Sequence, residues 1–238
     1  DGEIVSYQWT QTEGTSVELS GADTANASFL IPNEAATGNL IFSLTVTDNR
    51  GAIASVSVTI VLSSKVSGKV TFDLVPLDSS TSGLDYASTR IAPARGILVE
   101  LLDSENNLIA STTTDAAGGY SLSSGLNSEL RVRVSSRMVS GDIWDVKVTD
   151  NTNGGALYAG QGELFNPSVD DVVRDLHFDS GWSGDGYGEA RSAGPFAILD
   201  AVYEAKQTFF SVDPALRFPA LEIFWSEKNS SADGSIEE

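Results

Sequence analysis

The sequence predicts a mainly β protein, with two successive β-sandwiches followed by an α+β segment that contains one main helix. Apolar residues alternate with small polar ones over 40–47 and 52–61, which is the period of strands with one buried face. Turn-forming glycine, asparagine, aspartate and proline residues separate short apolar runs through residues 1–140. Helical spacing of apolar residues is concentrated in 192–210. We expect three parts: 1–62, 63–140 and 141–238.

Residues 1–62 are expected to form the first sandwich. The expected strands are residues 4–9, 17–19, 27–31, 40–47 and 52–61. Asp48–Gly51 should join the last two strands in a tight turn, because Asn49 and Gly51 tolerate positive φ angles. Trp9 lies on the first strand, where a tryptophan of a β-sandwich usually belongs to the core.

Three runs in this segment carry a family resemblance: DGEIVSYQW, VELSGADTANASFLIPN and LIFSLTVTDNRGAIASVSVTIVL. Together they resemble a PKD domain, an immunoglobulin-like module common in extracellular bacterial proteins. A PKD domain has two more strands before the position of Asp1-Gly2, so the resemblance implies an N-terminally truncated domain. A truncated sheet exposes an edge that can pair with another chain, and we therefore expect an edge-strand dimer.

Residues 63–140 are expected to form the second sandwich, interrupted by a polar insertion at 76–95. The runs VSGKVTF, ARGILVELLDSENNLIASTTTDAAGGYSL and LRVRV resemble the carboxypeptidase regulatory-like domain, a transthyretin-like sandwich. The resemblance implies an accessory module without catalysis. The basic cluster Arg131, Arg133 and Arg137 is interpreted as a solvated sheet face, with contact to an acidic partner as the alternative.

Residues 141–238 show a different pattern. Residues 144–148 and 221–225 read as strands, and 179–188 must be a loop because of its glycine density. A helix is expected to start at Ser192, with Pro195 near its first turn, and to end near Phe210. The runs SAGPFAILDAVYEA and FPALEIFWSEKN resemble secreted gammaproteobacterial proteins that have a metallopeptidase-like domain downstream. The resemblance implies that this segment opens such a domain.

We expect no catalytic residues in the chain. A zincin helix needs two histidines four residues apart, and His177 is the only histidine. Ser183 lies in a run that lacks the last glycine of a G-x-S-x-G motif. His177 and Asp179 lie nearby, but we expect residues so close on an extended chain to point to alternate sides. A strand histidine with an ordinary hydrogen bond is the expected role of His177.

The loop at 179–188 is the candidate metal site, with Asp179 and Asp185 as ligands of Ca²⁺. Calcium takes six to eight oxygen ligands from carboxylates and from the carbonyls of sharply turning loops. Asp170, Asp171 and Asp175 lie just before the loop and add negative charge. The alternative is a glycine loop that binds no metal.

Charge limits the partners of the chain. Lys and Arg total 14 against 33 Asp and Glu, for a formal net charge of −19. Nucleic acid and anionic membranes are disfavoured, because both attract positive charge. No apolar run reaches the roughly 18 residues that span a bilayer.

These observations favour an extracellular, periplasmic or outer-surface location, with protein or polysaccharide of the cell surface or extracellular matrix as the partner. The expected function is a non-catalytic accessory region of a secreted metallopeptidase-like protein. It would act as a spacer and as a contact with substrate or surface. The alternative is a stalk segment of a bacterial adhesin.

Overall fold

The structure is a computed structural model that describes residues 2–31, 39–81, 83–125, 129–141, 143–167, 171–188 and 190–229. The chain forms two compact units. Unit 1 comprises Asp1–Val66, Ser123–Leu130 and Leu164–Val172, and unit 2 comprises Ser67–Leu122, Arg131–Glu163 and Val173–Glu238. Strands dominate both units, which confirms the predicted mainly β class with a single main helix.

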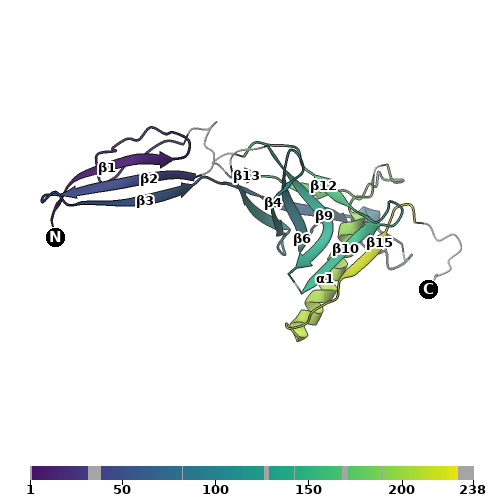
Figure 1. Cartoon of the computed structure of the whole chain (residues 1–238). Helices are drawn as coiled ribbons and strands as arrows, with labels where there is room; N and C mark the ends of the chain where they lie inside the picture. The colour runs from purple at the N-terminus through teal and green to yellow at the C-terminus, as the bar shows by residue number, and fades with distance from the viewer. Residues whose placement is uncertain are drawn as a thin grey trace. The chain divides into compact units, whose positions relative to one another are not determined.

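Unit 1 contains a three-stranded antiparallel sheet in the order β1-β2-β3 (Figure 1). The strands are β1 (Ile4–Glu13), β2 (Asn39–Asp48) and β3 (Ile53–Val61). Leu40, Phe42 and Leu62 form the buried core, and Trp9 packs against it as expected. At the predicted turn, Gly51 has a φ of 82°. The Asp48 carboxylate accepts hydrogen bonds from two backbone N–H groups of this turn, which fixes the hairpin.

The strands expected at 17–19 and 27–31 are not formed, and that prediction is wrong. A single bridge joins Ser20 to Ser28, because Gly21, with a φ of 70°, turns the chain between them. The backbone of this segment is tied to β1 by the Trp9 N–H, which donates to the Ala22 carbonyl at 2.7 Å. The apolar side chains of the segment still pack against the core: Val17, Leu19, Phe29 and Ile31.

Unit 2 is built around two sheets. The first has the order β11-β10-β9-β6-β7, with β12 paired to β9 and β15 paired to β10. The second is centred on β4, which pairs with β13, β14, β5 and β8. The bounds are β4 (Ser64–Leu74), β5 (Arg90–Pro93), β6 (Ile97–Asp103), β7 (Leu108–Thr113), β8 (Gly119–Ser124), β9 (Leu130–Ser140), β10 (Trp144–Asp150), β11 (Ala156–Leu157), β12 (Ala159–Gln161), β13 (Val172–Val173), β14 (Leu176–Phe178) and β15 (Leu221–Trp225).

Alternate side chains of the central strands supply the core of unit 2. Val70 and Phe72 of β4, and Ile97, Val99 and Leu101 of β6, are all at most 1% exposed. This alternation is the pattern of strands with one face turned inward. The insertion at 76–95 also contributes regular structure that the sequence did not predict, namely β5 and a 3₁₀ turn, η1 (Tyr86–Ser88).

Strands on the two sides of the expected boundary at residue 140 pair with one another. β10 pairs antiparallel with β9, β15 pairs parallel with β10, and β14 pairs parallel with β4. Strands from the expected segments 63–140 and 141–238 therefore share both sheets of unit 2. The division of the chain at residues 62 and 140 stays a prediction about sequence modules, which strand pairing does not define.

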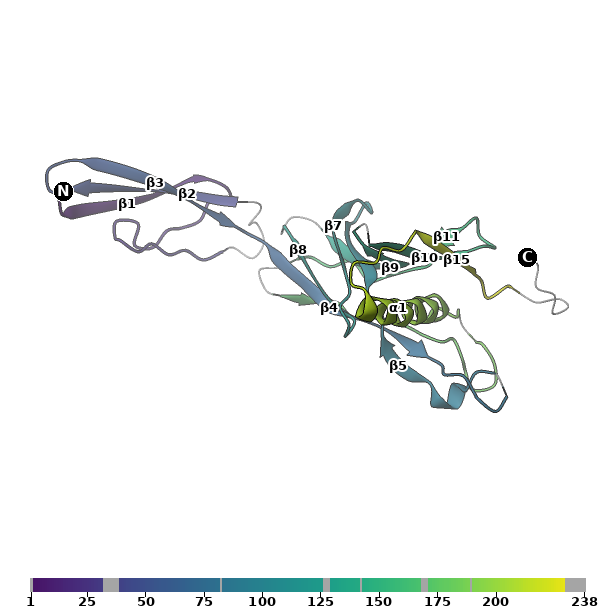
Figure 2. The same cartoon turned by 90° about the horizontal axis from the view of Figure 1, so that it is seen from below.

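The main helix, α1 (Gly194–Val212), packs against β10 (Figure 2). Phe196 and Leu199 are buried on its inner face, as the helical spacing predicts. Pro195 lies in the first turn, where a missing N–H costs no helical hydrogen bond. In the described part of the chain, no helix combines the length and the apolar character needed to cross a membrane.

Candidate functional site

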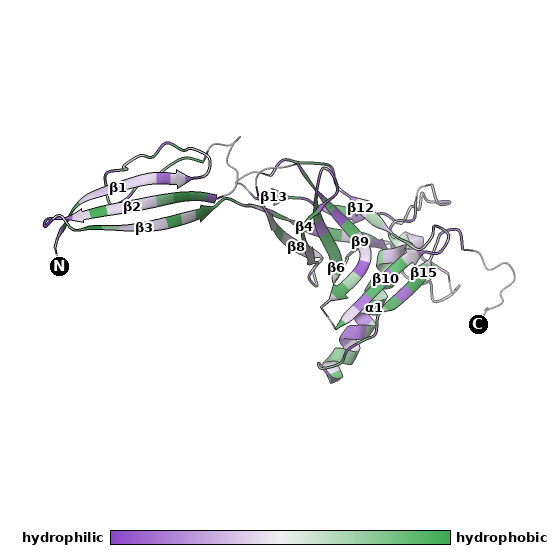
Figure 3. Ribbon diagram, in the orientation of Figure 1, coloured by the Kyte–Doolittle hydropathy of each residue, from purple (hydrophilic) through white to green (hydrophobic). Residues whose placement is uncertain are grey.

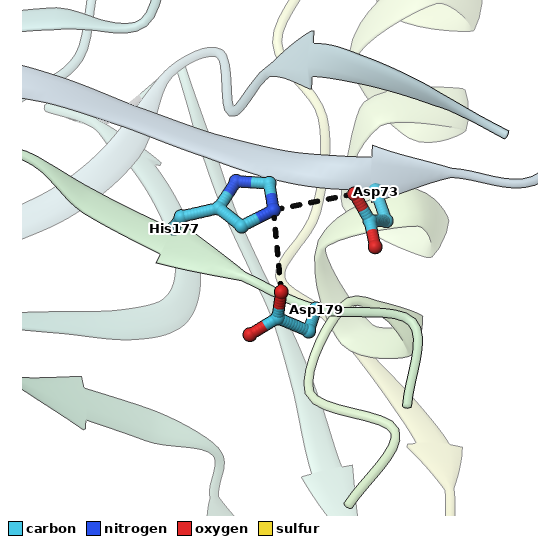
Figure 4. Close-up of side chains that lie close together, drawn as sticks. All are labelled: Asp73, His177 and Asp179. Carbon is cyan, nitrogen blue, oxygen red and sulfur yellow. Dashed lines mark hydrogen bonds and ion pairs between the residues drawn. The ribbon is translucent and has the colours of Figure 1, made fainter. Parts of the chain in front are cut away.

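His177, Asp73 and Asp179 point their side chains toward one another in unit 2 (Figure 4). His177 Nε2 lies 3.2 Å from Asp73 Oδ1 and 3.6 Å from Asp179 Oδ1. Asp73 is near the end of β4, and His177 lies on β14, which runs alongside it. The expectation that His177 and Asp179 point to alternate sides is wrong, because residues two apart on an extended chain share a face.

A chain of hydrogen bonds joins a hydroxyl, the imidazole and a carboxylate. His177 Nδ1 lies 2.9 Å from Thr71 Oγ1, and Nε2 faces Asp73. Thr71 is the register partner of His177, so this contact is an ordinary cross-strand pair. Ser183 does not join the chain of bonds, since its hydroxyl donates to the Gly186 carbonyl within its own loop at 2.9 Å.

The same three side chains could hold a divalent metal ion. Their ligand atoms all lie within 4.8 Å of one another, and the Ser180 N–H fixes the second oxygen of Asp73 at 3.0 Å. One imidazole nitrogen with two carboxylates suits a transition metal better than calcium, which takes oxygen ligands. Exposed acidic groups are also common without any metal.

The structure separates the two predicted calcium ligands into different surroundings. Asp179 belongs to the cluster with His177, whereas the Asp185 carboxylate accepts a long hydrogen bond of 3.4 Å from Ser183. Carbonyls that a calcium ion could use accept hydrogen bonds inside the loop, at Gly181 and Gly186. The calcium site at Asp179 and Asp185 therefore stays a prediction.

The acidic residues before the loop have other contacts. Asp175 accepts a hydrogen bond from the Lys69 N–H at 2.7 Å. Asp171 lies 3.7 Å from the Lys65 ammonium. Asp170 lies outside the described residues.

Three aromatic rings hold the glycine loop against the 76–95 insertion. Trp182 stacks on Tyr86 with ring centroids 4.0 Å apart, and Tyr187 meets both rings edge-on. The hydroxyls of Tyr86 and Tyr187 hydrogen-bond to each other. Burial, together with this hydrogen bond, raises the pKa of Tyr86 to about 12. The two tyrosines are 101 residues apart in the chain, so no local sequence pattern indicates the contact.

A pocket of about 270 Å³ lies where β10, β14 and β15 end near the start of α1. We call it the Arg191 pocket. Its lining combines aromatic and charged side chains: Phe178, Phe196, Trp225, Tyr158, Arg191, Lys228, Asp150 and Glu227. The sequence does not single out Arg191, because it stands in no motif and its aromatic neighbours come from distant parts of the chain.

Comparisons with known proteins address mainly the first unit. Residues 1–62 match the family model described as K319L-like, PKD domain. No curated protein matches the chain. Among solved structures, BcpA, the major pilin subunit of Bacillus cereus, is similar at 9% identity and a TM-score of 0.25. That similarity covers 74% of this chain and 59% of BcpA, and at this TM-score it supports no conclusion about fold or function. Residues 1–62 are therefore PKD-like, in the immunoglobulin-like class of β domains.

Proposed function

We propose that the chain is a non-catalytic spacer and contact region of a secreted or surface-attached protein. The observation that carries the proposal is the PKD-type match at residues 1–62, since PKD domains are immunoglobulin-like modules of extracellular proteins. In this proposal unit 1 acts as a spacer, and unit 2 contacts a protein or polysaccharide of the cell surface or matrix.

The basic cluster on β9 does not favour a nucleic-acid partner. The basic cluster on β9 is largely neutralised, because Arg133 pairs with Glu100 at 2.9 Å and Arg137 pairs with Asp145 at 2.8 Å. Little positive charge from this cluster remains for a polyanion such as nucleic acid. This agrees with the interpretation of these arginines as a sheet face and not as a docking site.

In its finer form, the proposal places this region beside a metallopeptidase-like domain of the same protein. The support is the resemblance of 63–140 and of the runs around α1 and β15 to accessory segments of such proteins. The alternative is an adhesin stalk. A His-Glu-x-x-His motif in the complete protein would favour the peptidase, and an array of further sandwiches would favour the stalk.

The proposal is tested with the whole chain, labelled with a fluorophore and incubated with washed cells, cell-wall fractions and extracellular polysaccharide. We expect saturable retention on at least one fraction that unlabelled chain competes away. A matched acidic protein of similar charge is the control for non-specific adsorption. Retention no greater than that of the control on every fraction would contradict the proposed contact role.

A further inference from the structure

The arginine of the Arg191 pocket contacts aromatic rings and not a carboxylate. The Arg191 guanidinium carbon lies 4.2 Å from the Tyr187 ring centroid and 5.7 Å from that of Trp225. Among the described residues, no carboxylate pairs with this guanidinium. Arg95, Arg133 and Arg137, in contrast, each have a carboxylate oxygen within 2.9 Å.

Arg191 contacts aromatic rings although the chain is strongly acidic. With 33 acidic residues against 14 basic ones, an arginine has many carboxylates available for pairing. Aromatic rings instead fix the Arg191 guanidinium in place and leave its fork of N–H donors for another acceptor. That fork matches a carboxylate, which takes two parallel hydrogen bonds.

Most other polar side chains around the pocket already have partners inside the protein. The Asp150 carboxylate accepts from Thr152, and the Tyr158 hydroxyl donates to the Trp225 carbonyl at 2.8 Å. The Ser192 hydroxyl donates to the Asp179 carbonyl at 3.0 Å, and the Ser226 hydroxyl bonds with that of Thr152 at 2.9 Å. The Glu227 carboxylate accepts a long hydrogen bond of 3.5 Å from the Arg191 backbone N–H. The donors left for a ligand are the Arg191 guanidinium and the Lys228 ammonium, and a ligand would meet them beside the two acidic side chains of the lining. A ligand rich in hydroxyl groups would find few free partners.

The rest of the pocket is apolar. Phe178 stacks on Phe196 with ring centroids 3.9 Å apart, and both side chains are almost fully buried. Trp225 and Tyr158 meet edge-on at 5.4 Å and add a second aromatic surface. A volume of about 270 Å³ is just below the range of drug-sized pockets, so it suits one residue-sized group.

We infer that the Arg191 pocket binds an apolar carboxylate, the group that the C-terminal residue of a peptide chain presents. The carboxylate lies on the Arg191 guanidinium, and the apolar side chain lies against Phe178, Phe196 and Trp225. This inference rests on the proposed contact function and names the ligand class of that contact. A uronic acid also carries a carboxylate, but its hydroxyl groups lack partners in the pocket.

The test uses the whole ¹⁵N-labelled chain and follows the Trp225 indole resonance, assigned with Trp225→Phe. N-acetylphenylalanine is titrated against N-acetylphenylalanine amide, which has the same ring but no carboxylate. We expect the acid to bind at least tenfold more tightly than the amide. Arg191→Gln should reduce acid binding to the level of the amide, and Arg191→Lys should retain part of the difference. Arg90→Gln, an exposed arginine of β5, is the control and should change nothing.

Equal binding of acid and amide to the wild-type chain, or no binding of either, would overturn the inference whether or not Arg191→Gln folds. Arg191-dependent binding of galacturonic acid, with none of N-acetylphenylalanine, would overturn the peptide class. Thermal unfolding of each variant shows whether a loss of binding reflects a loss of fold. The surface-retention assay separates the two proposals: if Arg191→Gln is retained like the wild type, the pocket is not the contact, and the proposed function still stands.

Discussion

Lys206 of α1 is a charged residue in an apolar place. It is 5% exposed, and its ammonium lies 4.6 Å from the Trp144 ring centroid and 5.1 Å from that of Phe218. Its nitrogen has no hydrogen-bond acceptor among the described residues. Burial lowers the pKa of Lys206 from 10.5 to about 8, while Asp145 acts weakly in the opposite direction. The cation–π contacts compensate only part of the lost hydration.

Replacing Lys206 with methionine should stabilise the protein at neutral pH. At pH 7 the lysine is charged in both the folded and the unfolded state, so the folded state bears the full cost of burying the charge. A pKa difference of this size corresponds to at most about 3 kcal/mol in the free energy of unfolding. We expect Lys206→Met to raise the Tm by several degrees at pH 7 in thermal unfolding.

The contribution of Lys206 to stability depends on pH, and its sign follows from the lowered pKa. The folded pKa is lower than the unfolded one, so wild-type stability should rise as the pH increases from about 8 to 10.5, where only the unfolded state still binds the proton. Lys206→Met should lack this rise, and Lys69→Met, at an exposed lysine, should keep it. Parallel curves for wild type and Lys206→Met over this range would show that Lys206 is not the titrating group.

The calcium prediction for Asp179 and Asp185 is tested by thermal unfolding in Ca²⁺ and in Mg²⁺ at equal ionic strength. A site with an affinity near 10 μM would add roughly 2.7 kcal/mol at a hundredfold excess of calcium. The prediction requires a Tm increase in Ca²⁺ that exceeds that in Mg²⁺, and its loss in Asp185→Ala. Identical unfolding curves in calcium, magnesium and chelator would contradict a calcium site at this loop.

Among the elements, β3 contains hydrophobic residues (Figure 3), and several of their side chains are exposed. It stands at one end of the order β1-β2-β3, and Ile53, Val56 and Val61 are more than half exposed. An edge strand with apolar side chains is a template for pairing with another chain. We expect the weight-average mass from light scattering to rise with protein concentration, and Val56→Lys to abolish this rise.

The matched control is Leu30→Lys, at a residue of unit 1 that is 89% exposed but lies outside any strand. This variant should associate like the wild type. A mass that stays monomeric over the whole concentration range would contradict pairing through β3. A similar loss of association in both variants would indicate a general effect of added charge.

Elements with a strong local pattern could be predicted from the sequence. β15 has the expected bounds, and α1 begins and ends within two residues of the expected ones, because apolar spacing and Pro195 are local signals. The secondary structure of the insertion at 76–95 could not be predicted from local patterns. β5 there forms only by pairing with β4, and its own residues show little alternation.

The candidate sites depend on contacts between residues that are distant in the chain. Such sites are harder to predict from the sequence than the strands and the helix. Asp73 and His177 are 104 residues apart and meet only because β14 pairs with β4. The sequence predicts His177 on a strand but does not indicate its carboxylate partner on β4. Arg191 is surrounded by rings from the glycine loop and β15, so the pocket exists only in the folded unit.

For the molecule as a whole, we expect no peptidase activity from the purified chain. A zinc peptidase of the His-Glu-x-x-His type needs two histidines, and this sequence has one. Fluorescent casein and gelatin should remain intact with and without added zinc, measured against a metallopeptidase as positive control. Turnover that a chelator abolishes, and that persists through a second purification step, would contradict a non-catalytic role.

The parallel pair of β10 and β15 has a consequence for the order of folding during synthesis. β1, β2 and β3 all come from the first 61 residues, so this sheet can assemble early. The first sheet of unit 2 is complete only when Leu221–Trp225 reaches β10, and β4 must wait for β14. Pairings between such distant residues form slowly, because a long loop must close first. Until residue 225 has emerged, the nascent chain presents open strand edges, and chaperones would have to shield them.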